Sequence, residues 1–73
     1  MLEVRLFATL REGREKVYFL EAEKYKVPAD ILDELKIPHE EVAITLINGR
    51  HSKLDTSLKD GDLVAIFPPV GGG

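Results

Sequence analysis

The fold of this chain is decided by one stretch of sequence, Asp60-Gly61-Asp62-Leu63-Val64-Ala65-Ile66-Phe67-Pro68-Pro69. The first three residues have the chemistry of a turn, and the five apolar residues after them predict a strand. The two prolines must end that strand, because proline has no backbone N–H to donate to a neighbouring strand. We therefore expect a final strand over residues 63–67.

The beginning of the sequence predicts a β-hairpin. Leu2, Val4 and Leu6 recur at every second position, which is the pattern of a strand with one buried face. A second apolar run, residues 17–20, is rich in aromatic and branched side chains and supplies the partner strand. Between the two strands, the alternating charges of residues 12–16 predict a solvated turn.

A short helix is expected next, over residues 28–36. Pro28 suits the first helical position, and carboxylates in the first turns together with Lys36 at the end match the helix dipole. Pro38 cannot continue a helix, so the chain must leave it there in an extended conformation.

The remaining pattern is a second hairpin. Residues 42–47 are a β-branched run that ends at Asn48-Gly49, the dipeptide best suited to a type I′ turn, and residues 50–53 would form a short polar partner strand. This element order matches an α+β fold of the β-grasp (ubiquitin-like) type. One short helix would pack across one face of a mixed four- to five-stranded sheet, with the first and last strands central and parallel. With no repeat or linker, we expect a single domain, 1–73, that carries a flexible Gly-rich tail over about 68–73.

Composition excludes several classes of function. The chain has 73 residues and no cysteine, so disulfides, thiolate metal sites and thiol nucleophiles are absent, and few apolar side chains can be spared for a large pocket. Its net charge of -3 argues against nucleic acid as a partner. It has neither an apolar run that could span a bilayer nor the layout of a signal peptide, so we expect no membrane association and a cytoplasmic location. His39 and His51 lack paired ligand spacing, and we expect no metal site.

The tail is the unusual feature of the sequence, Pro68-Pro69-Val70-Gly71-Gly72-Gly73. Three glycines give a thin segment without Cβ atoms, which from Pro68 could reach about 20 Å when extended. Such a segment could pass through a narrow channel into the active site of another protein. A carboxylate at its end is a poor electrophile, so it would need activation by ATP as an acyl-adenylate before one of its oxygens could be displaced. On the glycines alone, a frayed tail without function stays an open alternative.

Both ends of the chain resemble the MoaD/ThiS family of sulfur-carrier proteins. The segments that carry the resemblance are residues 4–12, Val4-Arg5-Leu6-Phe7-Ala8-Thr9-Leu10-Arg11-Glu12, and residues 60–73. The resemblance implies that the terminal Gly73 is adenylated by a partner similar to the ubiquitin-activating enzymes and converted to a thiocarboxylate. Gly72 would be the second glycine of the pair, and Gly71 would add flexibility. The thiocarboxylate would then donate sulfur to molybdopterin or to the thiazole of thiamin.

The resemblance also implies partners and a docking surface. The matching docking positions are Phe7, Arg11 and Phe67, with Pro68 and the glycines entering the partner. Phe7 and Phe67 are out of phase with the core positions of their strands, so both rings should share an exposed face if the strands are adjacent. The expected partners are an adenylating enzyme, which uses the ATP, and either the molybdopterin synthase large subunit or thiazole synthase. The chain itself would bind no cofactor and would act as a co-substrate and not as an enzyme.

Three points stay open from the sequence. The segment Phe67-Pro68-Pro69-Val70 resembles the molybdopterin branch more than the thiamin branch, but it does not decide the pathway, nor molybdenum against tungsten. An activated Gly73 could instead form an isopeptide bond with a lysine, as in a protein modifier. A non-covalent binding module that kept the fold is the third possible function.

His51, Ser52 and Asp55 have the residue types of a catalytic triad, but nothing accompanies them that predicts an oxyanion hole, and we interpret them as a surface hairpin.

Overall fold

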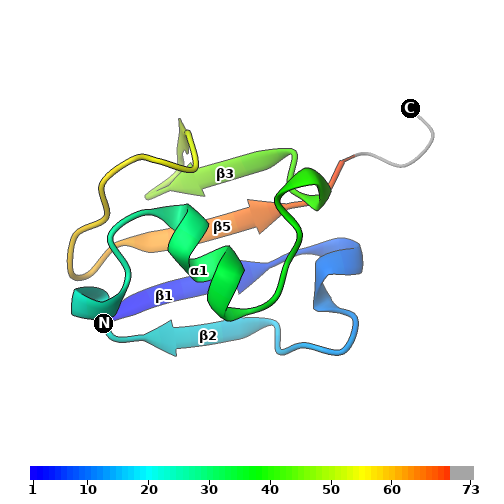
Figure 1. Ribbon diagram of the computed structural model, residues 1–73, viewed down its shortest axis with the longest axis horizontal. Helices are drawn as coiled ribbons and strands as arrows, with labels where there is room; N and C mark the ends of the chain where they lie inside the picture. Colours follow the sequence, from blue (N-terminus) through cyan, green and yellow to red (C-terminus); the bar gives the residue numbers. More distant parts are fainter. Residues whose placement is uncertain (70–73) are drawn as a thin grey trace.

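The computed structural model describes residues 1–69 and contains a five-stranded mixed sheet with one α-helix across one face (Figure 1). This confirms the predicted α+β class. The strands are β1 (Leu2–Leu6), β2 (Val17–Leu20), β3 (Ile44–Ile47), β4 (Arg50–Ser52) and β5 (Leu63–Phe67), and the helix is α1 (Pro28–Glu34). Three short 3₁₀ helices, which the sequence did not reveal, join them: η1 (Ala8–Arg11), η2 (Ala22–Lys24) and η3 (His39–Glu41).

The first and last strands are central and parallel, as predicted. The strand order is β2-β1-β5-β3-β4, and β1 pairs with β5 in a parallel register that sets Leu6 beside Ile66. The other three pairings are antiparallel. Because β1 and β5 run in the same direction, the loop after β1 and the chain after β5 leave the sheet at the same end (Figure 1).

The hydrophobic core lies between the sheet and α1. The side chains that alternate inward along the two central strands are fully buried, and so are two residues of the helix: Leu2, Val4, Leu6, Val64, Ile66, Ile31 and Leu32. Burying a side chain of this size contributes roughly 1.5–3 kcal/mol. Helix propensity contributes little in so short a helix, so packing must hold α1 in place. No helix of residues 1–69 covers the opposite face of the sheet (Figure 1).

The helix ends earlier than predicted, and the residue responsible is Lys36. Its φ angle of 58° is left-handed, so Lys36 lies outside the helix. The Lys36 amide donates to the carbonyl of Asp33 at 3.2 Å, and the Ile37 amide donates to Leu32 at 2.9 Å. These two bonds are the Schellman motif that satisfies the last carbonyls of a helix. Leu35, expected on the buried face of the helix, is the half-buried cap residue.

The second hairpin has the predicted turn. Asn48 and Gly49 have φ angles of 53° and 82°, as both central residues of a type I′ turn require. The Asn48 side chain also ties this turn to the start of β5, because it accepts from the Leu63 amide and donates to Asp62, both at 2.9 Å. None of the helices within residues 1–69 has the length and hydrophobicity needed to cross a membrane.

Candidate functional site

Two aromatic rings meet at the end of the sheet where the chain leaves β5. The register that pairs Leu6 with Ile66 places Phe7 beside Phe67 on the next position. Their ring centroids lie 4.3 Å apart with an interplanar angle of 9°, which is a stacked pair. The structure therefore brings together two residues that are 60 positions apart in the sequence and that the sequence singled out separately. Ile44 of β3 pairs with Phe67 on its other side and extends the apolar surface across a third strand.

The stacking corrects one expectation from the sequence. Both rings were expected to be exposed, but each is half-buried, because each ring covers one face of the other. Phe7 also lies just beyond β1, which ends at Leu6. Ala8, at a φ angle of 53°, turns the chain there, so that η1 begins directly after the ring.

Arg11 completes the stack. It is the last residue of η1, and its guanidinium carbon lies 5.4 Å from the centroid of the Phe7 ring, within the range of a cation–π contact. Its Nε donates a hydrogen bond to the Leu6 carbonyl at 2.8 Å, which fixes the guanidinium over the ring. The order Arg11, Phe7, Phe67 thus forms a three-layered surface feature with a positive charge at one end.

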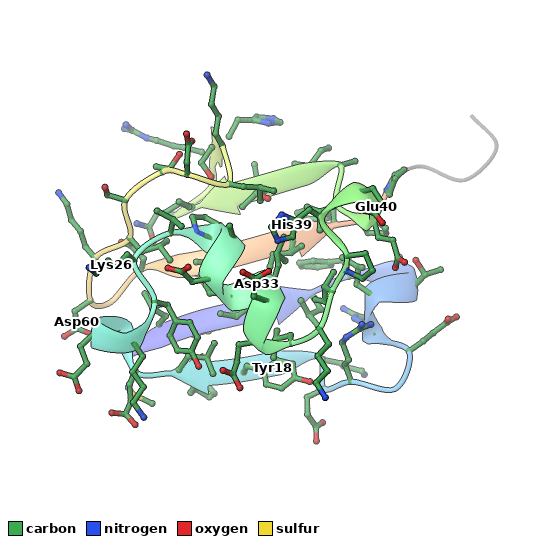
Figure 2. The ribbon with its side chains drawn as sticks, viewed as in Figure 1. Tyr18, Lys26, Asp33, His39, Glu40 and Asp60 are labelled. Atoms are coloured by element: carbon green, nitrogen blue, oxygen red, sulfur yellow. The ribbon has the colours of Figure 1, made fainter. Side chains whose placement is uncertain are left out.

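A groove of about 720 Å³ lies beside this stack, at the point where the chain leaves the sheet. Its mostly apolar side is formed by residues of η1, β3, the end of β5 and the segment after it, and they are Ala8, Thr9, Ile44, Phe67, Pro68 and Pro69. Glu40 and Glu41 of η3 line the rest of the groove. Figure 2 shows Glu40 next to the point where the chain leaves β5.

His39 of η3 makes an exposed contact to the helix. Nε2 of His39 lies 2.9 Å from a carboxylate oxygen of Asp33 on α1. Figure 2 shows these two side chains directed toward each other. The two glutamates that follow His39 in η3 line the groove, so one rim of the groove is acidic.

Comparison with known proteins identifies the family. The sequence profile of the ThiS family matches residues 4–73. The chain belongs to the ThiS family. It is 35% identical to small archaeal modifier protein 3 of Haloferax volcanii, over 99% of this chain and 98% of that protein. The solved structure of SAMP1 from Haloferax volcanii has a TM-score of 0.75 and 26% identity, covering 99% of this chain and 98% of that one.

A third relative comes from a complex. It is a chain in the protein–protein complex of subunits 1 and 2 of molybdopterin-converting factor from Helicobacter pylori, with a TM-score of 0.65 and 30% identity, covering 99% of this chain and 97% of that one. These neighbours confirm that the fold is the ubiquitin-like β-grasp, and they confirm the resemblance read from the two ends of the sequence. Proteins of the ThiS and MoaD type are small carriers and are not enzymes themselves.

The predicted site residues that the structure describes lie together. Phe7, Arg11 and Phe67 lie in one stack, and Pro68 is half-buried at the groove beside it. Gly71, Gly72 and Gly73 lie outside the described residues, so their predicted roles stay predictions. The sequence did not reveal Ala8, Thr9, Glu40, Glu41 or Ile44 as neighbours of the tail. In the structure, Ile44 is exposed and lies on the opposite face of β3 from the buried Thr45.

Other candidate chemistry does not gather at this site. Within residues 1–69, no group of three His, Cys, Asp or Glu residues is placed to hold a metal ion. Two groups within the described residues have shifted pKa values, one carboxyl group and one phenol, and both lie elsewhere. A hydrogen bond from the N-terminal ammonium lowers the pKa of Asp60, at the opposite end of the central strands. Burial, with the charge of Glu34, raises the pKa of Tyr25. The described part of the site therefore offers binding surface and no acid–base machinery.

Proposed function

We propose that this protein is a sulfur carrier whose working group is the carboxylate of Gly73. A carboxylate oxygen would attack the α-phosphorus of ATP on a partner enzyme, with release of pyrophosphate and formation of an acyl-adenylate. A sulfur nucleophile at the oxidation level of sulfide would then attack the acyl carbon. The carbon–oxygen bond to AMP would break, leaving a thiocarboxylate on Gly73. The chain acts as a co-substrate, and the ATP belongs to the partner.

The observation that carries the proposal is the placement of the Phe7–Phe67 stack at the base of the glycine tail. Parallel pairing of β1 and β5 puts the two rings where the chain leaves the sheet. A partner that receives the tail must therefore approach this surface first. The ThiS-family match, which extends through Gly73, supports the same role for the terminal residue.

We propose molybdopterin-type cofactor synthesis, with molybdenum or tungsten, as the pathway that receives the sulfur. The relative from Helicobacter pylori forms a complex between subunits 1 and 2 of molybdopterin-converting factor, which supports a synthase large subunit as one partner of this chain. The second partner is an adenylating enzyme of the ubiquitin-activating type. Donation to the thiazole of thiamin, through thiazole synthase, is the alternative within the same chemistry.

A protein modifier is the second candidate function, and a specific observation favours it. The relative that shares 35% identity across nearly the whole chain carries the name small archaeal modifier protein 3. In this reading the adenylate forms in the same way, but the ε-amine of a lysine displaces AMP and leaves an isopeptide bond to Gly73.

Intact-mass measurement tests the proposal. The full chain is incubated with ATP, a sulfide source and candidate adenylating enzymes from the same cell. The expected product is heavier by the difference between one sulfur and one oxygen atom, and a chain that lacks Gly73 stays unmodified. Failure to detect this product with each of those enzymes would contradict the sulfur-carrier role.

A second measurement separates carrier from modifier. An epitope-tagged chain is expressed in its own cells, and covalent conjugates are resolved under denaturing, reducing conditions. Conjugates that disappear when Gly73 is deleted would favour the modifier. If the function of the protein in these cells is unchanged after deletion of Gly72 and Gly73, the protein would instead be a non-covalent binding module.

A further inference from the structure

The groove at the base of the tail has an acidic rim. Its described lining contains Glu40 and Glu41 and no lysine, arginine or histidine. Both carboxylates are exposed, and neither takes part in an ion pair within the described chain. Two neighbouring carboxylates beside an apolar surface are therefore available to bind a positively charged group of a partner.

Because the tail is short, a protein that modifies Gly73 must bind close to the groove. Four residues follow Pro69, the last of them Gly73, so the terminal carboxylate can lie at most about 14 Å from Pro69. An active site buried in a partner must place its entrance within that distance. Because Pro68 and Pro69 themselves line the groove, the surface around that entrance must cover the groove when the reaction occurs.

The chemistry of the lining selects the side chain that fits. The floor made by Ile44, Phe67 and Pro68 is apolar, and the rim is doubly negative. Lysine and arginine side chains combine an aliphatic stem, which can lie on apolar surface, with a charged head. Arginine also matches carboxylates with two parallel hydrogen bonds, so it suits the Glu40–Glu41 pair better than lysine does.

We propose that the adenylating enzyme inserts an arginine or lysine from the rim of its tail-receiving channel into this groove, with its head on Glu40 and Glu41. This inference rests on the proposed function and names the recognition element of that partner. The contact acts on docking and leaves the acyl-transfer chemistry at Gly73 untouched.

Steady-state kinetics with the adenylating enzyme that passes the intact-mass assay test this proposal. The substrate is the full chain, and pyrophosphate release is the readout. The E40Q/E41Q double variant removes both charges with little change in shape. We expect its KM to rise about tenfold with kcat unchanged, because the lost contacts serve binding. The KM of the unaltered chain should rise with salt concentration more steeply than that of the variant.

The matched control is E21Q/E23Q, which makes the same change in net charge at the far end of the molecule from the groove. Its KM should stay at the unaltered value. Thermal unfolding of both variants checks that exposed substitutions leave the fold intact. Equal KM values for E40Q/E41Q and the unaltered chain would overturn the inference, and so would an equal rise in both double variants, which would indicate a general charge effect.

This design separates the two proposals. If the unaltered chain releases pyrophosphate but E40Q/E41Q has the same KM and salt dependence, the proposed function stands and the arginine or lysine contact falls. If no enzyme adenylates the unaltered chain, the carrier function itself fails, and the inference fails with it.

Discussion

Replacement of Arg14 by alanine should remove a large part of the stability of this domain. Arg14 is half-buried, and its guanidinium donates to four carbonyls in two separate segments, the longest of these bonds being the one from Nη1 to Glu12 at 3.5 Å. Nε and Nη2 reach Leu35 and Lys36 at the end of α1, at 3.2 and 3.0 Å. Nη1 reaches Leu10 in η1 at 3.3 Å. The same side chain therefore neutralises the negative end of the helix and ties it to the loop that carries Arg11.

The contacts give the magnitude. Each hydrogen bond contributes about 1 kcal/mol after partial exposure is taken into account, so R14A should lower the free energy of unfolding by roughly 2–3 kcal/mol. The whole domain is stabilised by only about 4–11 kcal/mol on the usual scale per residue. A loss of this size corresponds to a fall in melting temperature of roughly 10–20 °C for so small a chain.

Urea denaturation followed by far-UV circular dichroism measures the effect. R14K keeps the charge but has a single donor group, so it should lose about half as much stability as R14A. The control is K16A, because Lys16 is exposed and its side chain makes no hydrogen bond within the described residues; its effect should stay within about 0.5 kcal/mol. An R14A variant as stable as K16A would refute the assignment of Arg14 as the link between η1 and α1.

Three further predictions follow from other contacts. K36G should raise the free energy of unfolding by about 0.5–1 kcal/mol in urea titration, because glycine adopts the left-handed φ of that position without strain; a loss of stability would contradict the Schellman cap. A double-mutant cycle of F7A and F67A should give a coupling of about 0.5–1.5 kcal/mol for the stack, and additive effects would argue against it. The pKa of Tyr25, read from phenolate absorbance, should lie above its usual value of about 10 and fall in E34Q, because burial and then Glu34 raise it. Since the folded pKa is the higher one, the stabilisation from Tyr25 is complete below about pH 10 and is lost as pH rises through the folded value, so a Tyr25 pKa unaffected by E34Q would contradict this account.

The strands could be predicted from the sequence because their signals are local. Period-two alternation and the dense apolar run of residues 63–67 placed β1 and β5, and the structure has β5 at those bounds. Asn48-Gly49 placed the second hairpin because only a few residues tolerate two consecutive positive φ angles. Because side chains alternate between the two faces of a strand, the sequence also placed Phe7 and Phe67 on the face away from the core. The parallel pairing of β1 and β5 then brings the two rings together.

What the sequence could not supply depends on contacts between distant segments. The charges of residues 12–16 read as a solvated turn, but Arg14 is half-buried against the end of a helix that begins 14 positions later. Leu10 lies in the same connection between β1 and β2 and is fully buried, because η1 directs its side chain into the hydrophobic core. Glu40 and Glu41 were interpreted as a polar connection. They lie at the groove because the segment after η3 bonds to the end of β5, where the Ala43 amide donates to the Phe67 carbonyl at 2.9 Å.

The topology explains why recognition and chemistry can be divided in so small a protein. Two parallel central strands must end on the same side of the sheet, so whichever residue follows β1 becomes a neighbour of whichever residue ends β5. In this chain those residues are Phe7 and Phe67, and the tail begins immediately after the second ring. Under the proposed function, a partner that binds the stack and the groove would thereby align the tail with its own active site, without any contribution from the tail itself. Substitutions at the stack should consequently raise KM for adenylation, whereas loss of Gly73 should abolish the reaction while docking persists. That separation would not hold in a fold with antiparallel central strands, because the docking pair and the tail would then lie at opposite ends of the sheet.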